Sequence, residues 1–377
     1  MLHLAKAFSE RGHKVDLVLC QHEGPYANKI PQNVNMIELQ RTGTGLSRLR
    51  ILQIHPKALR SLCLPILLTC KPPKTIRYIH SLAAYLHNEQ PDALLSAKTP
   101  ANLVAIWAKR LAKAKTRIVL SERTHLSTGT KQSPKWRWRF MAPLIKEVYP
   151  QAERIVTVSR GVADDLATST GLPRETIETI YNPILTTEIA EKSQTPPSHP
   201  WLPSTSLPVI LGVGRLVPQK DFPTLLKAFA HVQKKYPSRL LILGEGRERA
   251  RLEALASELG IEENVSFPGF ESNPYTFMSR ASVFVLSSAW EGLPNALIEA
   301  LACGCPVVST NCPSGPQEIL DNGAFGALVP VGDDKALAEA ILQTLKQPPN
   351  ADRLRARAAE FDIHTIAEQY LQALLPT

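Results

Sequence analysis

The chain alternates short apolar runs rich in β-branched residues with longer stretches in which apolar residues recur every three or four positions. The first pattern favours buried strands and the second favours amphipathic helices. Their alternation is typical of parallel sheets covered by helices. The predicted strands of the first half are Val15–Cys20, Val34–Leu39, Ala93–Ser96, Arg117–Ser121, Arg154–Val158 and Glu178–Tyr181. Those of the second half are Val209–Val213, Leu240–Leu243, Val265–Phe267, Val283–Leu286 and Val307–Thr310.

Each half has the content of one α/β domain. A chain of 377 residues is longer than a single core usually organises, so two domains are expected. Residues 195–208 lie between the halves and contain five prolines without a periodic apolar pattern. We therefore predict a first domain over residues 1–186, a linker over residues 187–208 and a second domain over residues 209–360.

The beginning of the chain departs from this layout. Residues 2–12 have the pattern of an amphipathic helix that ends at Gly12, and the first predicted strand follows it. A sheet of this kind is expected to begin with a strand and a glycine-rich loop ahead of its first helix. The pattern therefore predicts either that Met1 is an internal methionine of a longer gene product or that the first domain lacks its first strand.

Two glutamates eight residues apart, Glu291 and Glu299, follow the predicted strand Val283–Leu286. Glu291 falls in the loop after the strand, and Glu299 falls on a helix predicted to begin at about Pro294. Eight helical positions span about 12 Å, which is the reach from a sugar across a diphosphate to a ribose. The N–H groups at the helix start would receive the diphosphate. The alternative is two solvated surface glutamates.

A second candidate motif follows the strand Val209–Val213. Gly214 lets the backbone approach a ligand closely, and Arg215 and Lys220 supply positive charge. The alternative is two surface cations beside a turn. Gly244 and Gly246 form half of a dinucleotide fingerprint, which is a weak signal without its third glycine.

The segment around Glu291 and Glu299 resembles the signature of retaining nucleotide-sugar glycosyltransferases with the two-domain GT-B fold, especially glycosyltransferase family four. The motifs are strong from about Val209 to Asp334. The resemblance implies that Glu291 contacts the donor sugar, Glu299 holds the ribose hydroxyls, and Arg215 and Lys220 bind the diphosphate. Phe270 either lines the nucleobase pocket or packs a loop. The implied donor-binding set is Gly214, Arg215, Lys220, Gly244, Phe270, Glu291, Gly292, Leu293, Pro294, Asn295 and Glu299, with Glu291, Lys220 and Arg215 as its catalytic members.

The resemblance also implies a role for the first half as the acceptor side. Arg123 and His125 follow the strand Arg117–Ser121 and are the acceptor-side candidates, although a structural salt bridge explains them equally well. The helical pattern over Lys131–Tyr149 predicts either a helix packed on the sheet or a basic helix at a membrane surface. Residues 361–377 form a predicted C-terminal helix, which in GT-B enzymes completes the first domain.

Composition changes this picture little. Hydrophobic residues make up 44% and charged residues 20% of the chain, as in ordinary globular proteins. No apolar run reaches the roughly 18 residues of a spanning helix, and no secretory signal opens the chain. Six cysteines without paired spacing favour a reduced, cytosolic protein.

The charge is uneven, which does change the picture. Residues 1–190 hold 27 Lys and Arg against 14 Asp and Glu, a net charge of +13, whereas the whole chain carries +9. Such an excess attracts phosphates, nucleic acid or an anionic membrane leaflet. The alternative is a surface that is merely well solvated.

These observations predict an α/β protein of two Rossmann-like domains that moves a sugar from a nucleotide sugar, UDP-linked by resemblance, with retention of configuration. The predicted acceptor is a saccharide or a polyprenyl-diphosphate-linked sugar in cell-envelope polysaccharide assembly. No cofactor or metal is expected, since an Asp-x-Asp motif is absent. We expect a cytoplasmic protein with peripheral contact to the inner face of the cytoplasmic membrane, and no nucleic-acid partner. The missing first strand leaves an alternative, a catalytically impaired nucleotide-sugar-binding protein.

Overall fold

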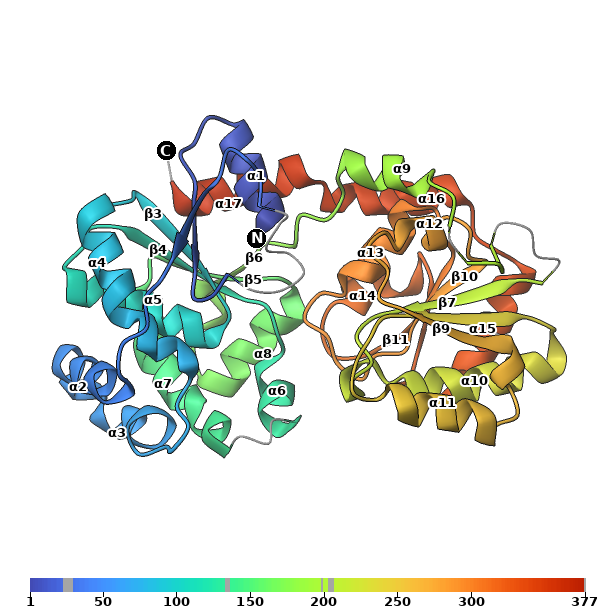
Figure 1. Ribbon diagram of the computed structural model, residues 1–377, viewed down its shortest axis with the longest axis horizontal. Coiled ribbons are helices and arrows are strands. Elements are labelled where there is room, and N and C mark those ends of the chain that lie inside the picture. The colour runs from blue at the N-terminus through green and yellow to red at the C-terminus, as the bar shows by residue number, and fades with distance from the viewer. Residues whose placement is uncertain (23–29, 133–135, 198, 203–206, 376–377) are drawn as a thin grey trace. The chain divides into compact units, whose positions relative to one another are not determined.

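A computed structural model describes residues 1–22, 30–132, 136–197, 199–202 and 207–375 of the chain (Figure 1). It divides into two compact units. The first comprises Met1–Pro183 and Ile363–Thr377, and the second comprises Ile184–Asp362. Both contain parallel sheets with helices, which confirms the predicted α/β class.

The strands of the first unit form two parallel sheets. One contains β1 and β2, and the other has the order β3-β4-β5-β6. All six predicted strands are present with each end within two residues of its predicted position, as is normal for element boundaries. Their bounds are β1 Asp16–Leu19, β2 Asn35–Glu38, β3 Ala93–Ala97, β4 Arg117–Glu122, β5 Arg154–Thr157 and β6 Ile177–Thr179.

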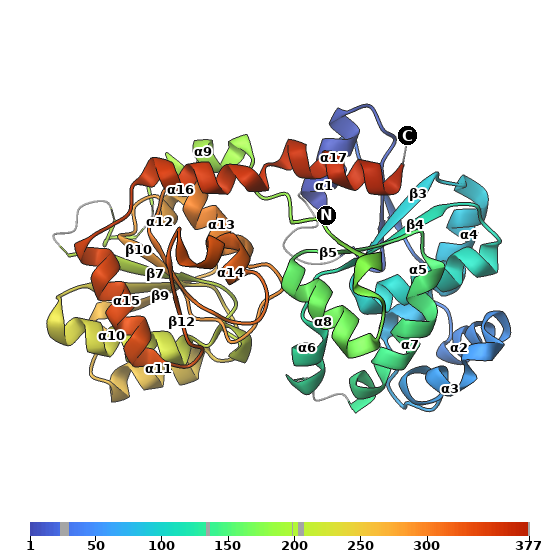
Figure 2. The same cartoon turned by 180° about the vertical axis from the view of Figure 1, so that it is seen from behind.

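Helices cover both faces of the larger sheet in this unit (Figures 1 and 2). On one face the fully buried Trp107 anchors α5 in the core. On the other, α17 contacts β3, β4 and α1, and its buried Tyr370 donates a hydrogen bond to the Ile180 carbonyl at 3.4 Å. The C-terminal helix therefore belongs to the first unit. The helices of this unit are α1 Leu2–Glu10, α2 Thr44–Ile54, α3 Leu59–Leu62, α4 Ile79–Glu89, α5 Thr99–Ala112, α6 Leu126–Gln132, α7 Met141–Val148, α8 Arg160–Thr170 and α17 Ile363–Leu374.

The helical pattern predicted over Lys131–Tyr149 is interrupted in the structure. It contains the end of α6, a 3-10 turn over Trp136–Phe140 and then α7. Proline at position 134 disfavours a continuous helix, because it lacks an N–H donor and restricts the residue before it. Residues 133–135 lie outside the described part of the chain, and so does that part of the basic helix proposed for a membrane surface.

The second unit contains one parallel sheet with the order β12-β11-β10-β7-β8-β9. The five predicted strands are present, and β12 was not predicted. The bounds are β7 Val209–Val213, β8 Arg239–Leu243, β9 Val265–Gly269, β10 Val283–Leu286, β11 Val307–Thr310 and β12 Ala327–Val329.

Helices lie on both faces of this sheet as well (Figure 2). Phe229 of α10 and Ile341 of α15 are fully buried in the core that these helices share with the sheet. On the opposite face, α13 packs on β10 and β11. The helices of the unit are α9 Thr187–Ser193, α10 Phe222–Lys235, α11 Arg249–Glu258, α12 Tyr275–Met278, α13 Asn295–Ala302, α14 Pro316–Ile319, α15 Asp334–Lys346 and α16 Ala351–Ala358.

The segment expected to be a linker, residues 187–208, lies in the second unit. Its first residues form α9, which contacts α12 and buries Ile189. Arg280 and Ser279 donate hydrogen bonds to the Ser193 carbonyl at 2.9 and 3.1 Å. These contacts hold α9 against the rest of the second unit, and the composition of the segment did not indicate them.

The strand order of the second unit fixes where a ligand would bind. From β7 the chain moves outward through β8 and β9, and then returns to β10 on the other side of β7. Because all these strands are parallel, their carboxyl ends meet at one edge. The point between β7 and β10 is therefore a topological switch point, where open α/β sheets bind their ligands.

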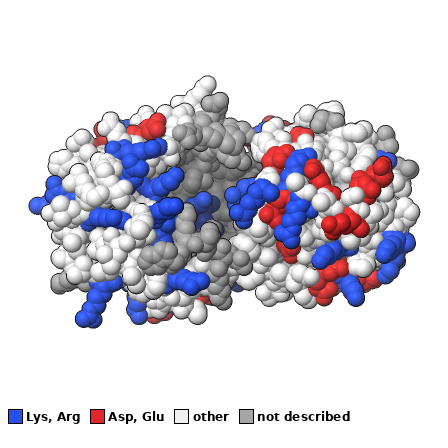
Figure 3. All heavy atoms as spheres, turned by 60° about the horizontal axis from the view of Figure 1, so that its bottom comes forward, with Lys and Arg blue, Asp and Glu red and all other residues white. Residues whose placement is uncertain are grey.

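Charge is distributed differently over the two units. On the face shown in Figure 3, the first unit displays Lys and Arg with few acidic residues, whereas both signs are mixed on the second unit. Among the described residues, no helix combines the length and apolar character needed to cross a bilayer.

Candidate functional site

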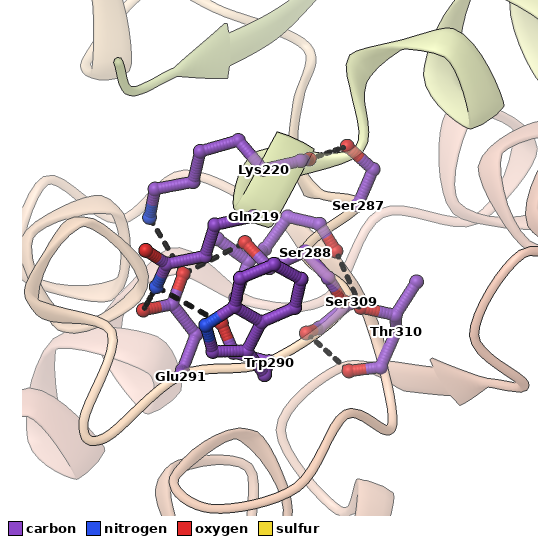
Figure 4. Close-up of polar contacts among 9 residues, drawn as sticks. Gln219, Lys220, Ser287, Ser288, Trp290, Glu291, Ser309 and Thr310 are labelled. Carbon is purple, nitrogen blue, oxygen red and sulfur yellow. Dashed lines mark hydrogen bonds and ion pairs between the residues drawn. The ribbon is translucent and has the colours of Figure 1, made fainter. Parts of the chain in front are cut away.

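An ion pair joins the two loops that flank the switch point. Lys220 ends the 3-10 turn that follows β7, and Glu291 lies in the loop after β10. The Lys220 Nζ atom is 2.6 Å from Glu291 Oε1, and their side chains are only 17% and 8% exposed (Figure 4). Two residues predicted independently from separate motifs are therefore in direct contact.

Both carboxylate oxygens of Glu291 are occupied. The Ser288 hydroxyl donates to Oε1 at 2.7 Å, and the Gln219 amide donates to Oε2 at 3.3 Å (Figure 4). A buried carboxylate needs such compensation, because desolvation costs several kcal/mol per ion. Gln219 and Ser288 were not predicted, since their only signal in the sequence is that each lies in the same loop as a predicted charged residue.

The backbone of the lysine loop is fixed by the same neighbours. The Ser287 hydroxyl donates to the Lys220 carbonyl at 2.8 Å, and the Ala289 N–H donates to the Gln219 carbonyl at 2.9 Å. A Cβ atom at Gly214 would lie 3.0 Å from the Lys220 side chain, so glycine leaves room for that side chain. The ammonium group is thus held in one place before any ligand binds.

Gly244 brings the loop after β8 against the loop after β7. Its φ is +136°, and a Cβ atom there would lie 2.0 Å from the Gly214 carbonyl oxygen. Its N–H also donates to the Gly269 carbonyl at 2.7 Å, at the end of β9. This close approach of three loops explains why glycine stands here.

Glu299 lies in the electrostatic field of the same lysine. Burial raises the pKa of its carboxyl group to about 7, against the opposing effects of a hydrogen bond with Tyr275 and the positive charge of Lys220. The site therefore brings Lys220, Glu291 and Glu299 together. Tyr275, which follows β9 by six residues, was not predicted.

The loop between Glu291 and Glu299 is closely packed. Gly292, Leu293 and Pro294 are buried, and a Cβ atom at Gly315 would lie 2.4 Å from Pro294 Cδ. Pro294 is the N-cap of α13 and the exposed Asn295 is its first residue, one position later than predicted. Since α13 follows β10, its positive dipole end lies at the carboxyl edge of the sheet.

Two further predicted residues stand exposed at this edge. Arg215 follows Gly214 in the loop after β7, and Phe270 follows the end of β9 with 59% of its surface exposed. That exposure argues against loop packing as the role of Phe270. Within the described ranges, no three His, Cys, Asp or Glu side chains converge as metal ligands would.

Comparisons with known proteins identify the family of this chain. The family model of Glycosyltransferase Family 4 matches residues 1–188, and that of Glycosyl transferases group 1 matches residues 199–361. A Campylobacter jejuni protein named N-acetylgalactosamine-N,N'-diacetylbacillosaminyl-diphospho-undecaprenol 4-alpha-N-acetylgalactosaminyltransferase is 33% identical over 282 residues, which cover 73% of each chain. This chain belongs to the group 1 and family 4 glycosyltransferases.

Other relatives and solved structures support the same family and fold. The lipopolysaccharide core biosynthesis glycosyltransferase LpsE of Rhizobium meliloti is 38% identical over 172 residues, or 44% of this chain and 49% of LpsE. Anabaena HepE in complex with UDP-glucose superposes with a TM-score of 0.74 at 20% identity, covering 99% of this chain and 94% of HepE. The apo form of the outer core galactosyltransferase WaaB gives 0.62 at 22% identity, with 80% and 79% covered. These likenesses confirm the predicted GT-B fold.

The acceptor-side candidates of this glycosyltransferase have separate partners in the first unit. Arg123 donates a hydrogen bond to Asn182 Oδ1 at 2.5 Å and also forms a hydrogen bond with the side chain of Tyr370. His125 Nδ1 lies 3.3 Å from an Asp165 carboxylate oxygen and within hydrogen-bond distance of two hydroxyl groups. The structure does not pair the two candidates with each other, and each has a structural contact.

The buried ion pair predicts strong energetic coupling between its members. Lys220→Met leaves the Glu291 carboxylate buried without its cation, and we expect it to lower the free energy of unfolding by about 3–5 kcal/mol. Adding Glu291→Gln should recover most of that loss, because the uncompensated charge is removed. Urea unfolding of both single variants and the double variant measures the coupling. Additive losses would contradict an essential pairing.

Proposed function

We propose that this glycosyltransferase takes a sugar from a UDP-sugar and transfers it, with retention of configuration, to a lipid-linked saccharide in envelope polysaccharide assembly. The observation that carries the donor side of the proposal is the Lys220–Glu291 ion pair at the switch point, with Glu299 in the field of the same lysine. HepE, whose fold is similar, was solved with UDP and with UDP-glucose. Retention rests on the resemblance of the Glu291–Glu299 motif to retaining enzymes.

Lys220 would stabilise the departing diphosphate. Its ammonium group has three N–H donors, and the contact with Glu291 uses one of them. The others can bind phosphate oxygens while the ion pair stays intact. Together with Arg215 and the start of α13, the lysine would neutralise charge as the bond to the sugar breaks, which is the effect that usually contributes most to catalysis.

The two glutamates would hold the two ends of the donor. Glu291, fixed by Lys220, Ser288 and Gln219, would orient the sugar hydroxyls. Glu299 would accept hydrogen bonds from the ribose hydroxyls, and Phe270 would lie beside the nucleobase. The carboxylate of Glu299 must be ionised for strong, charge-assisted bonds of this kind.

The acceptor side is proposed from the first unit. Residues 39–88 contain eight Lys and Arg and no Asp or Glu. The same stretch includes the exposed leucines Leu46, Leu49, Leu59, Leu64 and Leu68. Basic residues and exposed apolar residues together favour peripheral binding to an anionic leaflet, here the inner face of the cytoplasmic membrane. Arg123 and His125 are proposed to contact the acceptor or the donor sugar.

Turnover by the lysine variant tests the proposal as a whole. A screen of nucleotide sugars for thermal stabilisation identifies the donor, which is expected to carry UDP. With that donor and a diphospholipid-linked saccharide, Lys220→Ala should lower kcat at least about tenfold, a barrier increase of about 1.4 kcal/mol. An unchanged kcat would remove Lys220 from the mechanism. Donor binding without turnover by the unmodified chain would instead support a nucleotide-sugar-binding protein.

The raised pKa of Glu299 predicts a pH-dependent nucleotide affinity. At pH 6 the carboxyl group is mostly protonated and must lose its proton to bind the ribose, whereas at pH 8 it is already ionised. The affinity for UDP should therefore rise as pH increases through about 7. Calorimetry at both pH values should show that Glu299→Gln weakens binding at pH 8, by about 1.5–3 kcal/mol per charged hydrogen bond lost, and removes this pH dependence. Identical pH profiles of the two proteins would refute the ribose role.

A further inference from the structure

The first unit contains a pocket lined by donor groups and cations. Gln21, Arg41, Lys74, Arg77 and Tyr78 surround a space of about 80 Å³. Gln21 follows β1 and Arg41 follows β2, so the pocket lies at the carboxyl edge of this parallel pair. Carboxyl edges of parallel strands are where α/β domains bind ligands.

Two of the cations are held rigidly. Arg41 donates through Nε to the hydroxyl of the buried Tyr78 at 3.0 Å. Arg77 donates through Nε to the Thr42 carbonyl at 3.3 Å, while the Thr42 N–H donates to the Arg77 carbonyl at 2.8 Å. These contacts use one nitrogen of each guanidinium group and fix its plane. The terminal nitrogens remain suited to bidentate binding of phosphate oxygens.

The pocket has no acidic counterpart in the part of the chain that the structure describes. Ion pairs among the described residues of the first unit involve other cations, such as Arg11, Lys14, Lys109 and Arg174, and none of these pairs includes Arg41, Lys74 or Arg77. The surrounding residues 39–88 contain no Asp or Glu at all. Three cations gathered without a carboxylate from the described residues repel one another, and a multiply charged anion would relieve that repulsion.

We propose that this pocket binds a diphosphate group, and that the group is the one linking the acceptor saccharide to its lipid. The two guanidinium groups and the Lys74 ammonium neutralise the diphosphate, and the Gln21 amide adds a neutral donor. The assignment to the acceptor rests on the proposed function. The binding of a diphosphate anion follows from the pocket alone.

Binding is tested with inorganic pyrophosphate and the full chain. Excess UDP first occupies the donor site, and pyrophosphate is then titrated by calorimetry. The double variant Arg41→Gln/Lys74→Gln should bind pyrophosphate at least about tenfold more weakly. Lys115→Gln, which removes an exposed lysine just ahead of β4, should bind it as the unmodified chain does. Unchanged thermal unfolding, followed by circular dichroism, shows that both variants fold, since the substitutions lie in the first unit and the proposed UDP site lies in the second. Equal pyrophosphate affinity in all three proteins would overturn the site.

Acceptor kinetics then separate the two sources of the anion. If the pocket holds the acceptor, the double variant should raise KM for a saccharide on a short-chain isoprenoid diphosphate at least about fivefold, with little change in kcat, and Lys115→Gln should not. Weaker pyrophosphate binding with an unchanged KM assigns the pocket to a free diphosphate instead. If the enzyme transfers sugar to no lipid-linked acceptor, the proposed function is wrong, but the pyrophosphate titration still shows whether the pocket binds a diphosphate.

Discussion

The buried carboxylate of Glu291 is the constraint on which the candidate site depends. A carboxylate that is almost removed from water is tolerated only beside a cation and hydrogen-bond donors, and Lys220, Ser288 and Gln219 supply both. These partners come from the loops after β7 and β10, which are neighbours in the sheet although some 70 residues separate them in the chain. The electrostatics of one side chain thereby fixes the conformation of both loops at the point where a ligand would bind.

The backbone around this pair is arranged to keep it in place. Gly244 packs directly on the Gly214 carbonyl, and Gly315 packs on Pro294, so the loops around the ion pair lie closer than larger residues would allow. That arrangement requires a backbone conformation that residues other than glycine rarely adopt, since Gly244 and Gly315 both have positive φ values. A site held in this way needs little rearrangement when a charged ligand binds. Fixed dipoles and ions contribute to catalysis because they are already in place when charge develops.

Much of the fold and part of the site were accessible from the sequence. Eleven strands were predicted because most of them coincide with short apolar runs, and Lys220 and Glu291 were found because each follows such a run. Gln219, Ser288 and Tyr275 were missed, since polar residues of these types are common in loops and their role depends on contacts across the sheet. For the same reason α9 was taken for part of a linker, as its packing on α12 is not visible in its composition.

The central claim is that Lys220, Glu291 and Glu299 form one binding site for a nucleoside diphosphate. A crystal structure of the chain with UDP tests it most directly. The account predicts phosphate oxygens within hydrogen-bond distance of Lys220 Nζ and the start of α13, and ribose hydroxyls on the carboxylate of Glu299. UDP bound away from the loops after β7 and β10, with the Lys220–Glu291 pair uninvolved, would contradict it.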